Sequence, residues 1–126
     1  MTSEKVKASN FKDLLVWQKG ISLVKRIYVL SSKFPADERY GITSQMRRAA
    51  VSVPSNIAEG QARHTTGEFI QSVSHAEGSV AEVETQLIIA TELGYCTKPE
   101  TREALALVEE SRKMLNALRR ALVTSH

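Results

Sequence analysis

The chain has 126 residues, of which 42% are hydrophobic and 25% are charged. These values are typical of a single folded domain, and they exclude a collagen-like, low-complexity or wholly disordered chain. Because no apolar run approaches the roughly 18 residues of a membrane span, we expect a protein outside the membrane. Cys96 is the only cysteine, so no disulfide can form within the chain, and we expect a cytoplasmic location.

The net charge of +3 conceals a separation of charges along the chain. Residues 1–33 hold seven Lys or Arg and two acids, which gives this segment a net charge of +5. Residues 64–97 hold five Glu and no Lys or Arg, a net charge of −5. This uneven distribution of charge along the chain is more informative about binding partners than the net charge is.

The first helix is predicted over residues 13–32, after a polar and aperiodic leader at residues 1–10. Two apolar rows run along it at spacings of three and four, the period of an amphipathic helix. The first row holds Leu14, Trp17, Ile21, Val24 and Tyr28, and the second holds Val16, Leu23, Ile27 and Leu30. The apolar surface is therefore wider than one neighbouring helix would cover. Pro35 ends the helix, because the residue before a proline avoids the α region.

A second helix is predicted from Ile42 to about Arg63. Its inward row is Ile42, Met46, Ala49, Val53 and Ile57. Pro54 lies inside this segment and removes one backbone donor, so we expect a kink or a short break near Val53.

The third and fourth helices each begin with a capping box, Thr65 with Glu68 and Thr97 with Glu100. The third has an inward row of Phe69, Val73, Ala76, Val80, Val83, Leu87 and Ala90, and Gly94 closes it. The fourth has Ala104, Val108, Ser111, Leu115, Leu118 and Leu122. Four helices with short connections predict an all-α, up-down-up-down antiparallel four-helix bundle, a single domain over residues 11–126.

The sequence offers little catalytic chemistry. The three histidines, His64, His75 and His126, have no Cys or second His at zinc spacing, and the Glu-x-x-His pairs of a di-iron bundle are absent. No phosphate-cradling glycine loop is present. We therefore predict a protein that is not an enzyme and that has no catalytic residues, no metal and no cofactor.

Basic residues recur every seven positions in and before the first helix. They are Lys5, Lys12, Lys19, Arg26 and Lys33. Seven residues are close to two helical turns, so the helical members form one stripe. Three interpretations remain open: a solvated face, ion pairs with Glu68 and Glu82 or with Glu77 and Glu84 of the third helix in the same or another subunit, or contacts with nucleic-acid phosphates.

Arg47, Arg48 and Arg63 form a second basic group on the second helix. Adjacent arginines point about 100° apart, so at most one of Arg47 and Arg48 faces the core. One of them is a candidate ion-pair partner for Glu59, and the other is a candidate phosphate contact.

Gly78 and Ser79 lie in the middle of the third helix, where glycine costs about 1 kcal/mol relative to alanine. A small residue at such a place usually permits close approach of another helix. We therefore expect a helix–helix contact here.

Several motifs together resemble one bacterial family. They are Leu15-Val16-Trp17-Gln18-Lys19, Phe34-Pro35, Tyr40-Gly41, Gln45-Met46-Arg47-Arg48-Ala49-Ala50, Val51-Ser52-Val53-Pro54-Ser55-Asn56-Ile57-Ala58-Glu59-Gly60, Glu77-Gly78-Ser79 and Glu82-Val83-Glu84-Thr85-Gln86-Leu87. The chain resembles, from about residue 11 to residue 122, the four-helix-bundle proteins first noticed as reading frames in intervening sequences of large-subunit ribosomal RNA genes.

The resemblance implies a homopentameric ring. It also implies kinship with accessory proteins of diversity-generating retroelements, which bind nucleic acid and a reverse transcriptase. For most members the biological role is unassigned.

Two functions follow as hypotheses. The first is a non-enzymatic oligomer that binds RNA or DNA through weak phosphate contacts from Lys19, Arg26, Arg47, Arg48 and Arg63. The second is a protein-interaction scaffold, in which the basic stripe is consumed by ion pairs between subunits. The predicted subunit interface comprises Trp17, Glu77, Gly78, Ser79, Glu82 and Glu84.

Overall fold

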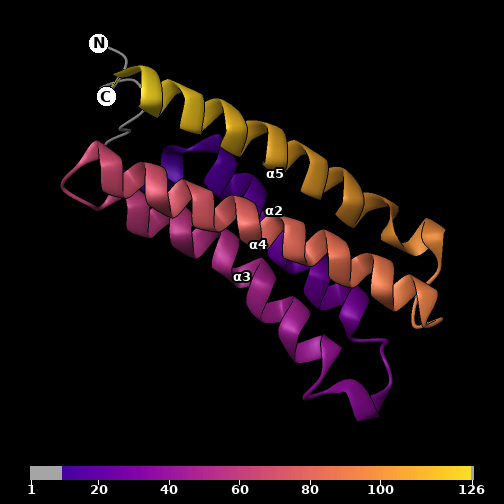
Figure 1. The fold of residues 1–126 in the computed structure, drawn as a ribbon. Coiled ribbons are helices and arrows are strands. Elements are labelled where there is room, and N and C mark those ends of the chain that lie inside the picture. Colours follow the sequence, from indigo (N-terminus) through magenta and orange to yellow (C-terminus); the bar gives the residue numbers. More distant parts are fainter. Residues whose placement is uncertain (1–9, 126) are drawn as a thin grey trace.

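The computed structural model describes residues 10–125, and all regular structure in this range is helical (Figure 1). The elements are the 3-10 helix η1 (Phe11–Asp13), α2 (Leu15–Ser31), the 3-10 helix η2 (Ala36–Glu38), α3 (Ile42–Gln61), α4 (Thr66–Glu92) and α5 (Lys98–Ser125). The predicted all-α class with four long helices is confirmed. The predicted leader lies outside the described residues except for Asn10, whose side chain caps η1.

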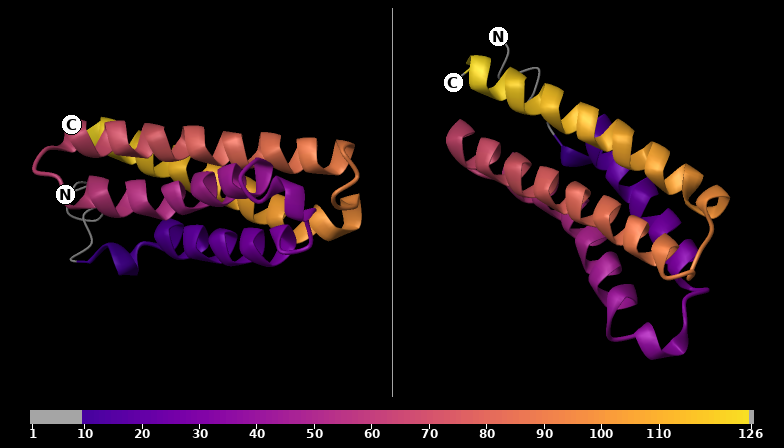
Figure 2. Two further views of the ribbon diagram at one scale, coloured as in Figure 1. Left: turned by 90° about the horizontal axis from the view of Figure 1, so that it is seen from below. Right: turned by 45° about the vertical axis from the view of Figure 1, so that its right-hand side comes forward.

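Each long helix packs against the next one along the chain, and α5 returns to pack against α2. The diagonal pairs, α2 with α4 and α3 with α5, make no close backbone contact. Figure 2 shows the same order around the bundle from two further directions, with neighbouring helices antiparallel. Within residues 10–125, no helix is long and apolar enough to cross a membrane.

The helix ends follow the capping signals of the sequence. Thr65 Oγ1 accepts a hydrogen bond from the Glu68 N–H at 3.1 Å, as the N-cap of α4. Thr97 and Glu100 form the second capping box, because the Thr97 N–H donates to Glu100 Oε1 at 2.8 Å. Gly94 has a φ of +79°, the left-handed conformation that glycine allows after a helix.

The core is built from the predicted inward rows. All seven residues of the predicted α4 row are buried, and so are Met46, Ala49, Val53 and Ile57 of α3. In α5 every member of the row is buried except Leu118, which is half-buried. In α2 the second apolar row faces the core, whereas the row that contains Trp17 is only partly covered.

Pro54 lies in the interior of α3, which continues unbroken through it. The chain therefore does not break at this point, and Figure 2 shows α3 bending so that its N-terminal half leads away from α4. Gly20 of α2 lies against the proline, since a Cβ atom added at Gly20 would lie 3.3 Å from Pro54 Cβ and Cδ. Asn56 Nδ2 donates to the Ser52 carbonyl at 2.8 Å, one turn away.

Candidate functional site

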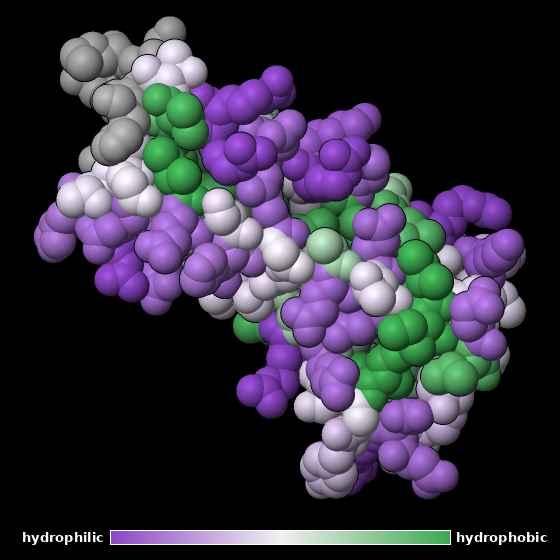
Figure 3. All heavy atoms as spheres, viewed as in Figure 1, coloured by the Kyte–Doolittle hydropathy of each residue, from purple (hydrophilic) through white to green (hydrophobic). Residues whose placement is uncertain are grey.

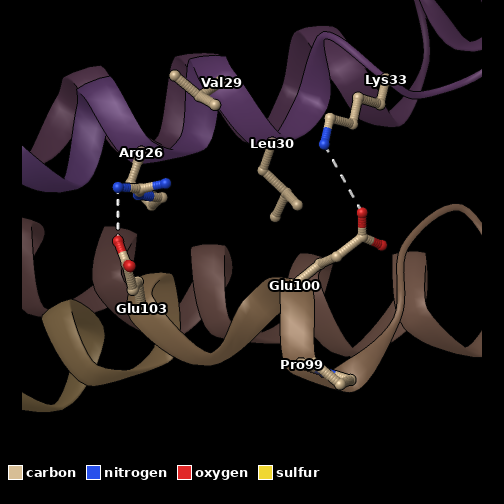
Figure 4. Close-up of a pocket in the computed structure, with 7 residues that line it drawn as sticks. All are labelled: Arg26, Val29, Leu30, Lys33, Pro99, Glu100 and Glu103. Atoms are coloured by element: carbon tan, nitrogen blue, oxygen red, sulfur yellow. Dashed lines mark ion pairs between the residues drawn. The ribbon is translucent and has the colours of Figure 1, made fainter.

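The basic stripe of α2 forms a ladder of ion pairs with α5, here called the α2–α5 ladder. Its pairs are Lys19 Nζ with Glu110 Oε2 at 3.5 Å, Arg26 Nη2 with Glu103 Oε2 at 2.5 Å, and Lys33 Nζ with Glu100 Oε2 at 3.8 Å. Figure 4 shows the Arg26 and Lys33 pairs, which face each other across the two helices.

The interpretation that paired the stripe with acids of the third helix within the chain is wrong. In the bundle, α2 and α4 are diagonal, whereas α2 and α5 are antiparallel neighbours. Glu103 and Glu110 are seven residues apart, as are Arg26 and Lys19. That matching period was a signal in the sequence that could have identified α5. Lys12 is exposed in η1, before the stripe enters α2, and Lys5 lies outside the described residues.

The ladder borders a hollow of about 260 Å³ that Val29, Leu30 and Pro99 also line (Figure 4). The Glu100 carboxylate at its rim is held by the backbone N–H and the hydroxyl of Thr97 and by Lys33, and these interactions lower its pKa. The two pairs of charged groups beside the hollow, Arg26 with Glu103 and Lys33 with Glu100, are therefore already neutralised within the chain.

The second basic group is divided among different surroundings. Arg47 Nε donates to Ser31 Oγ at 2.8 Å, so this arginine ties α3 to α2. Arg63 forms an ion pair with Glu59 at 3.5 Å, which corrects the expected pairing of Glu59 with Arg47 or Arg48. The reason is that residues four apart meet on one helix face. Arg48 is exposed and has no polar partner among the described residues.

Two of the predicted interface residues are used inside the bundle. Glu77 Oε1 accepts from Arg119 Nε of α5 at 3.0 Å, and both side chains are partly exposed. Ser79 Oγ lies 2.7 Å from Ser52 Oγ of α3, which joins these two helices. These contacts lie beside the core, not on the outer face of α4.

The helix–helix contact expected at Gly78 and Ser79 is present within the chain at Ser79, through Ser52, but not at Gly78. Gly78 is exposed, and a Cβ atom added there would meet nothing within 4 Å. Glu82 and Glu84 are also exposed, and Glu84 has no partner within residues 10–125, while Glu82 accepts from Gln86 at 3.4 Å. Trp17 is half-buried and packs edge-on against Phe11, with ring centroids 5.3 Å apart.

The outer face of α4 (here Ser74, Gly78, Ala81, Thr85, Ile88 and Ile89) combines small and apolar side chains. All six are exposed, and their spacings of three and four, with the adjacent Ile88 and Ile89 at the end, place them on one side of the helix. Ile88 and Ile89 expose 53% and 42% of their surfaces, and Leu93 exposes 55%. Figure 3 shows pale, small side chains along α4 and green hydrophobic ones gathered over its right-hand end.

A hollow of about 350 Å³ adjoins this face between α4 and α5. Its apolar walls come from Leu87, Ile88 and Leu105, and the charged side chains of Glu92, Lys98 and Arg102 stand around it. The exposed isoleucines and this hollow were not predicted. The sequence did contain a signal for exposed apolar surface here, the adjacent pair Ile88-Ile89. Neighbouring side chains on a helix point in different directions, so both could not face the same neighbouring helix.

No cluster of three or more His, Cys, Asp or Glu side chains within residues 10–125 could hold a metal ion. Cys96 is buried near the start of α5, with its sulfur 3.6 Å from Thr91 Oγ1. The absence of an enzymatic activity and of a cofactor remains a prediction.

Comparison with known proteins gives two findings. The model of the 23S rRNA-intervening sequence protein family matches residues 12–117. A crystal structure of a Bacteroides thetaiotaomicron protein of unknown function, from the S23 ribosomal protein family, superposes with a TM-score of 0.74 at 24% identity. The match covers 82% of this chain and 97% of that one, and it supports the fold. No curated protein matches.

Proposed function

Since the chain belongs to the 23S rRNA-intervening sequence protein family, we propose that it is a non-enzymatic, homo-oligomeric module assembled through the outer face of α4. Gly78 is the observation that carries this proposal. It lies near the middle of a 27-residue helix, where a glycine costs stability, and it makes no contact inside the chain. Close approach of a second chain would explain why this position has no side chain.

The surroundings of Gly78 fit such a contact. Ser74, Ala81 and Thr85 keep the backbone accessible, and Ile88 and Ile89 add apolar surface that is out of place on an isolated chain. The hollow between α4 and α5 continues this apolar surface. Apolar burial of this kind supplies the main driving force for association.

Charge complementarity supports contact between unlike faces. Around the outer face of α4, Glu84 and Glu92 have no ion-pair partner within residues 10–125. Several exposed bases also lack one in that range: Lys98 and Arg102 beside the hollow that adjoins this face, and Lys25, Arg39, Arg48, Lys113 and Arg120 elsewhere. Contacts between unlike faces close into rings when the rotation allows it. The homopentamer is the ring that we propose.

The test is the mass of the protein in solution, measured by light scattering coupled to size exclusion at tens of micromolar. We expect a discrete oligomer of five chains for the wild type and a monomer for Gly78→Glu, because a carboxylate would be buried at the contact. Gly67→Glu is the matched control, because Gly67 is also exposed on α4 with nothing within 4 Å. A monomeric wild type, or an unchanged Gly78→Glu oligomer, would refute the proposal.

Nucleic-acid binding is a second candidate function, favoured by the exposed bases that lack partners within the chain. Lys19, Arg26 and Arg63 would have to exchange a carboxylate for a phosphate, whereas Arg48 would not. Oligomerisation would multiply such weak contacts. A reverse transcriptase is the protein partner that we propose for a complex of this kind.

Retardation of structured RNA at increasing salt tests this second function. We expect binding that is indifferent to sequence and that weakens steeply with salt. Arg48→Glu should lower the affinity more than Arg26→Glu, because Arg26 is already paired with Glu103. No retardation at low salt would exclude this function and leave the assembly proposal intact.

A further inference from the structure

A hollow of about 380 Å³ lies at the end of the bundle where α2 ends and α3 begins. It is lined by Ser31, Ser32, Phe34, Pro35, Ala36, Arg39, Thr43 and Arg47. These residues provide two guanidinium groups and three hydroxyls, and none of them is an acid. The hollow therefore presents hydrogen-bond donors and positive charge together.

Arg47 is held firmly at the wall of this hollow. Its Nε donates to Ser31 Oγ at 2.8 Å and its Nη2 donates to the Tyr28 carbonyl at 3.4 Å. The guanidinium carbon also lies 4.4 Å from the centre of the Tyr28 ring, a cation–π contact. A guanidinium has five N–H donors, so this fixed group keeps donors for a ligand.

The carbonyl groups at the end of α2 would repel an anion, but two of them are already engaged. The Tyr28 carbonyl accepts from Arg47, and the Val29 carbonyl accepts from Ser32 Oγ at 2.7 Å. The nearby Glu38 carboxylate accepts from the Tyr95 hydroxyl at 2.7 Å and the Ile42 N–H at 3.2 Å. Glu38 therefore already has two donors of its own, and it does not line the hollow.

Arg39 and Thr43 contribute groups without partners. The exposed Arg39 side chain has no ion pair or hydrogen bond within the described part of the chain. The side chain of Thr43 also has none there, although the residue is only 8% exposed. Because two guanidinium groups line the same hollow, their positive charges together favour an anion there.

We propose that this hollow binds a phosphate monoester group. A tetrahedral oxyanion can accept hydrogen bonds from both guanidinium groups and from the Thr43 hydroxyl at the same time, whereas the Ser31 and Ser32 hydroxyls already donate to carbonyls of α2. The hollow is larger than one phosphate requires, so Phe34 and Pro35 offer an apolar wall to whatever the phosphate is attached to. The ligand is either free phosphate or the terminal phosphate of a nucleotide chain, and its binding does not depend on assembly.

Calorimetric titration of the full chain with inorganic phosphate, against chloride at equal ionic strength, tests the site. We expect binding to the wild type and a dissociation constant about tenfold higher for Arg39→Gln, since one charge-assisted hydrogen bond is lost. Arg112→Gln is the matched control, because Arg112 is an exposed arginine of α5 that does not line the hollow and has no part in the proposed nucleic-acid contacts. It should bind as the wild type does.

Thr43→Val is a second test variant that does not change the charge, and it should also weaken phosphate binding in the same titration. An oligoribonucleotide with a 5′-phosphate, compared with the same sequence ending in a 5′-hydroxyl, separates the two sources. Tighter binding of the phosphorylated chain would assign a terminal phosphate, and equal binding would assign free phosphate. The monomeric Gly78→Glu variant should bind phosphate normally. No heat of binding above that of chloride, or equal weakening by Arg39→Gln and Arg112→Gln, would overturn the proposal.

Discussion

At the scale of single residues, the half-buried Ser52 and the buried Ser111 show opposite solutions for a hydroxyl between helices. Ser52 Oγ lies 2.7 Å from Ser79 Oγ and accepts from Asn56 Nδ2 at 2.9 Å, so its polar group is satisfied. Ser111 is fully buried in α5, and its hydroxyl has no partner among the described residues. A buried polar atom without a partner lowers the stability of the folded state, because folding removes its hydrogen bonds to water and replaces them with none.

Ser111→Ala should therefore raise the free energy of unfolding by about 1 kcal/mol, measured by urea denaturation. Ser52→Ala is the comparison, and it should lower that free energy by about 1 kcal/mol, because it leaves the Ser79 hydroxyl without its partner and removes one of the two hydrogen bonds of Asn56 Nδ2. A loss of stability in Ser111→Ala would mean that this hydroxyl has a partner after all.

At the scale of helices, two glycines of the α3–α4 pair illustrate how closely the elements approach. A Cβ atom added at Gly60 would lie 2.7 Å from Ser72 Cβ and 2.8 Å from Phe69 Cδ1. At Gly67, the second residue of α4, an added Cβ would meet nothing within 4 Å. Gly60 is therefore required by the crossing of the two helices, whereas Gly67 is not.

Gly60→Ala should lower the free energy of unfolding by about 2 kcal/mol, because backbone or side chains must shift to admit the methyl group. Gly67→Ala should raise it by about 0.5 kcal/mol through helix propensity alone. Chemical denaturation of both variants measures the contrast. If both substitutions stabilised the protein, the close crossing at Gly60 would be disproved.

The α2–α5 ladder also belongs to this scale. Reversing one charge in Arg26→Glu places two carboxylates together and should lower the free energy of unfolding by about 1 kcal/mol at low salt. The double variant Arg26→Glu with Glu103→Arg should recover most of this loss, because the pair is restored in the opposite sense. Measurement in high salt should shrink the effect of the single variant. An Arg26→Glu chain of unchanged stability and altered oligomer mass would instead place the stripe between subunits.

At the scale of the whole molecule, one hydrogen bond joins the two loops at the same end of the bundle. The Tyr95 hydroxyl, between α4 and α5, donates to Glu38 Oε2 in η2 at 2.7 Å. The Tyr95 and Phe34 rings also pack, with centroids 5.8 Å apart. The hydrogen bonds from Tyr95 and from the Ile42 N–H lower the pKa of Glu38, and the same carboxylate raises the pKa of Tyr95.

A pH dependence of stability follows from these shifts. Because the folded pKa of Glu38 is lowered below 4.5, its contribution is present above that value and is lost as pH falls through the folded pKa. The pKa of Tyr95 is raised above 10.0, so its contribution is present below that value and is lost as pH rises through the folded pKa.

Tyr95→Phe keeps the ring but removes the hydroxyl. The stability difference between wild type and Tyr95→Phe should be constant between about pH 6 and 8 and should shrink below about pH 4.5. Denaturation curves at several pH values check this. A difference that does not change in acid would show that Glu38 does not accept this hydrogen bond.

Much of the architecture could be predicted because it is local. The rows at spacings of three and four identified the buried side of α4, and the capping boxes at Thr65 and Thr97 located two helix starts. The end of α4 at Gly94 follows from backbone conformation alone. These features depend only on neighbours within one or two turns.

The candidate sites depend on contacts between distant segments, which a single sequence does not specify. The period of seven showed that Arg26 and Lys19 share a face, but not which helix faces them. That choice follows from the order of helices around the bundle. Likewise, Arg39 and Arg47 are eight residues apart and line one hollow together with Ser31 and Ser32 from the end of α2, a grouping that depends on how α2 packs against α3.

The α2–α5 ladder has a consequence for the chain during its synthesis. The bases of α2 leave the ribosome long before Glu100, Glu103 and Glu110 of α5 are made. Lys19, Arg26 and Lys33 therefore gain their carboxylate partners only once α5 has been made and has packed against α2. Until then these three bases remain available to the polyanionic surface of the ribosome.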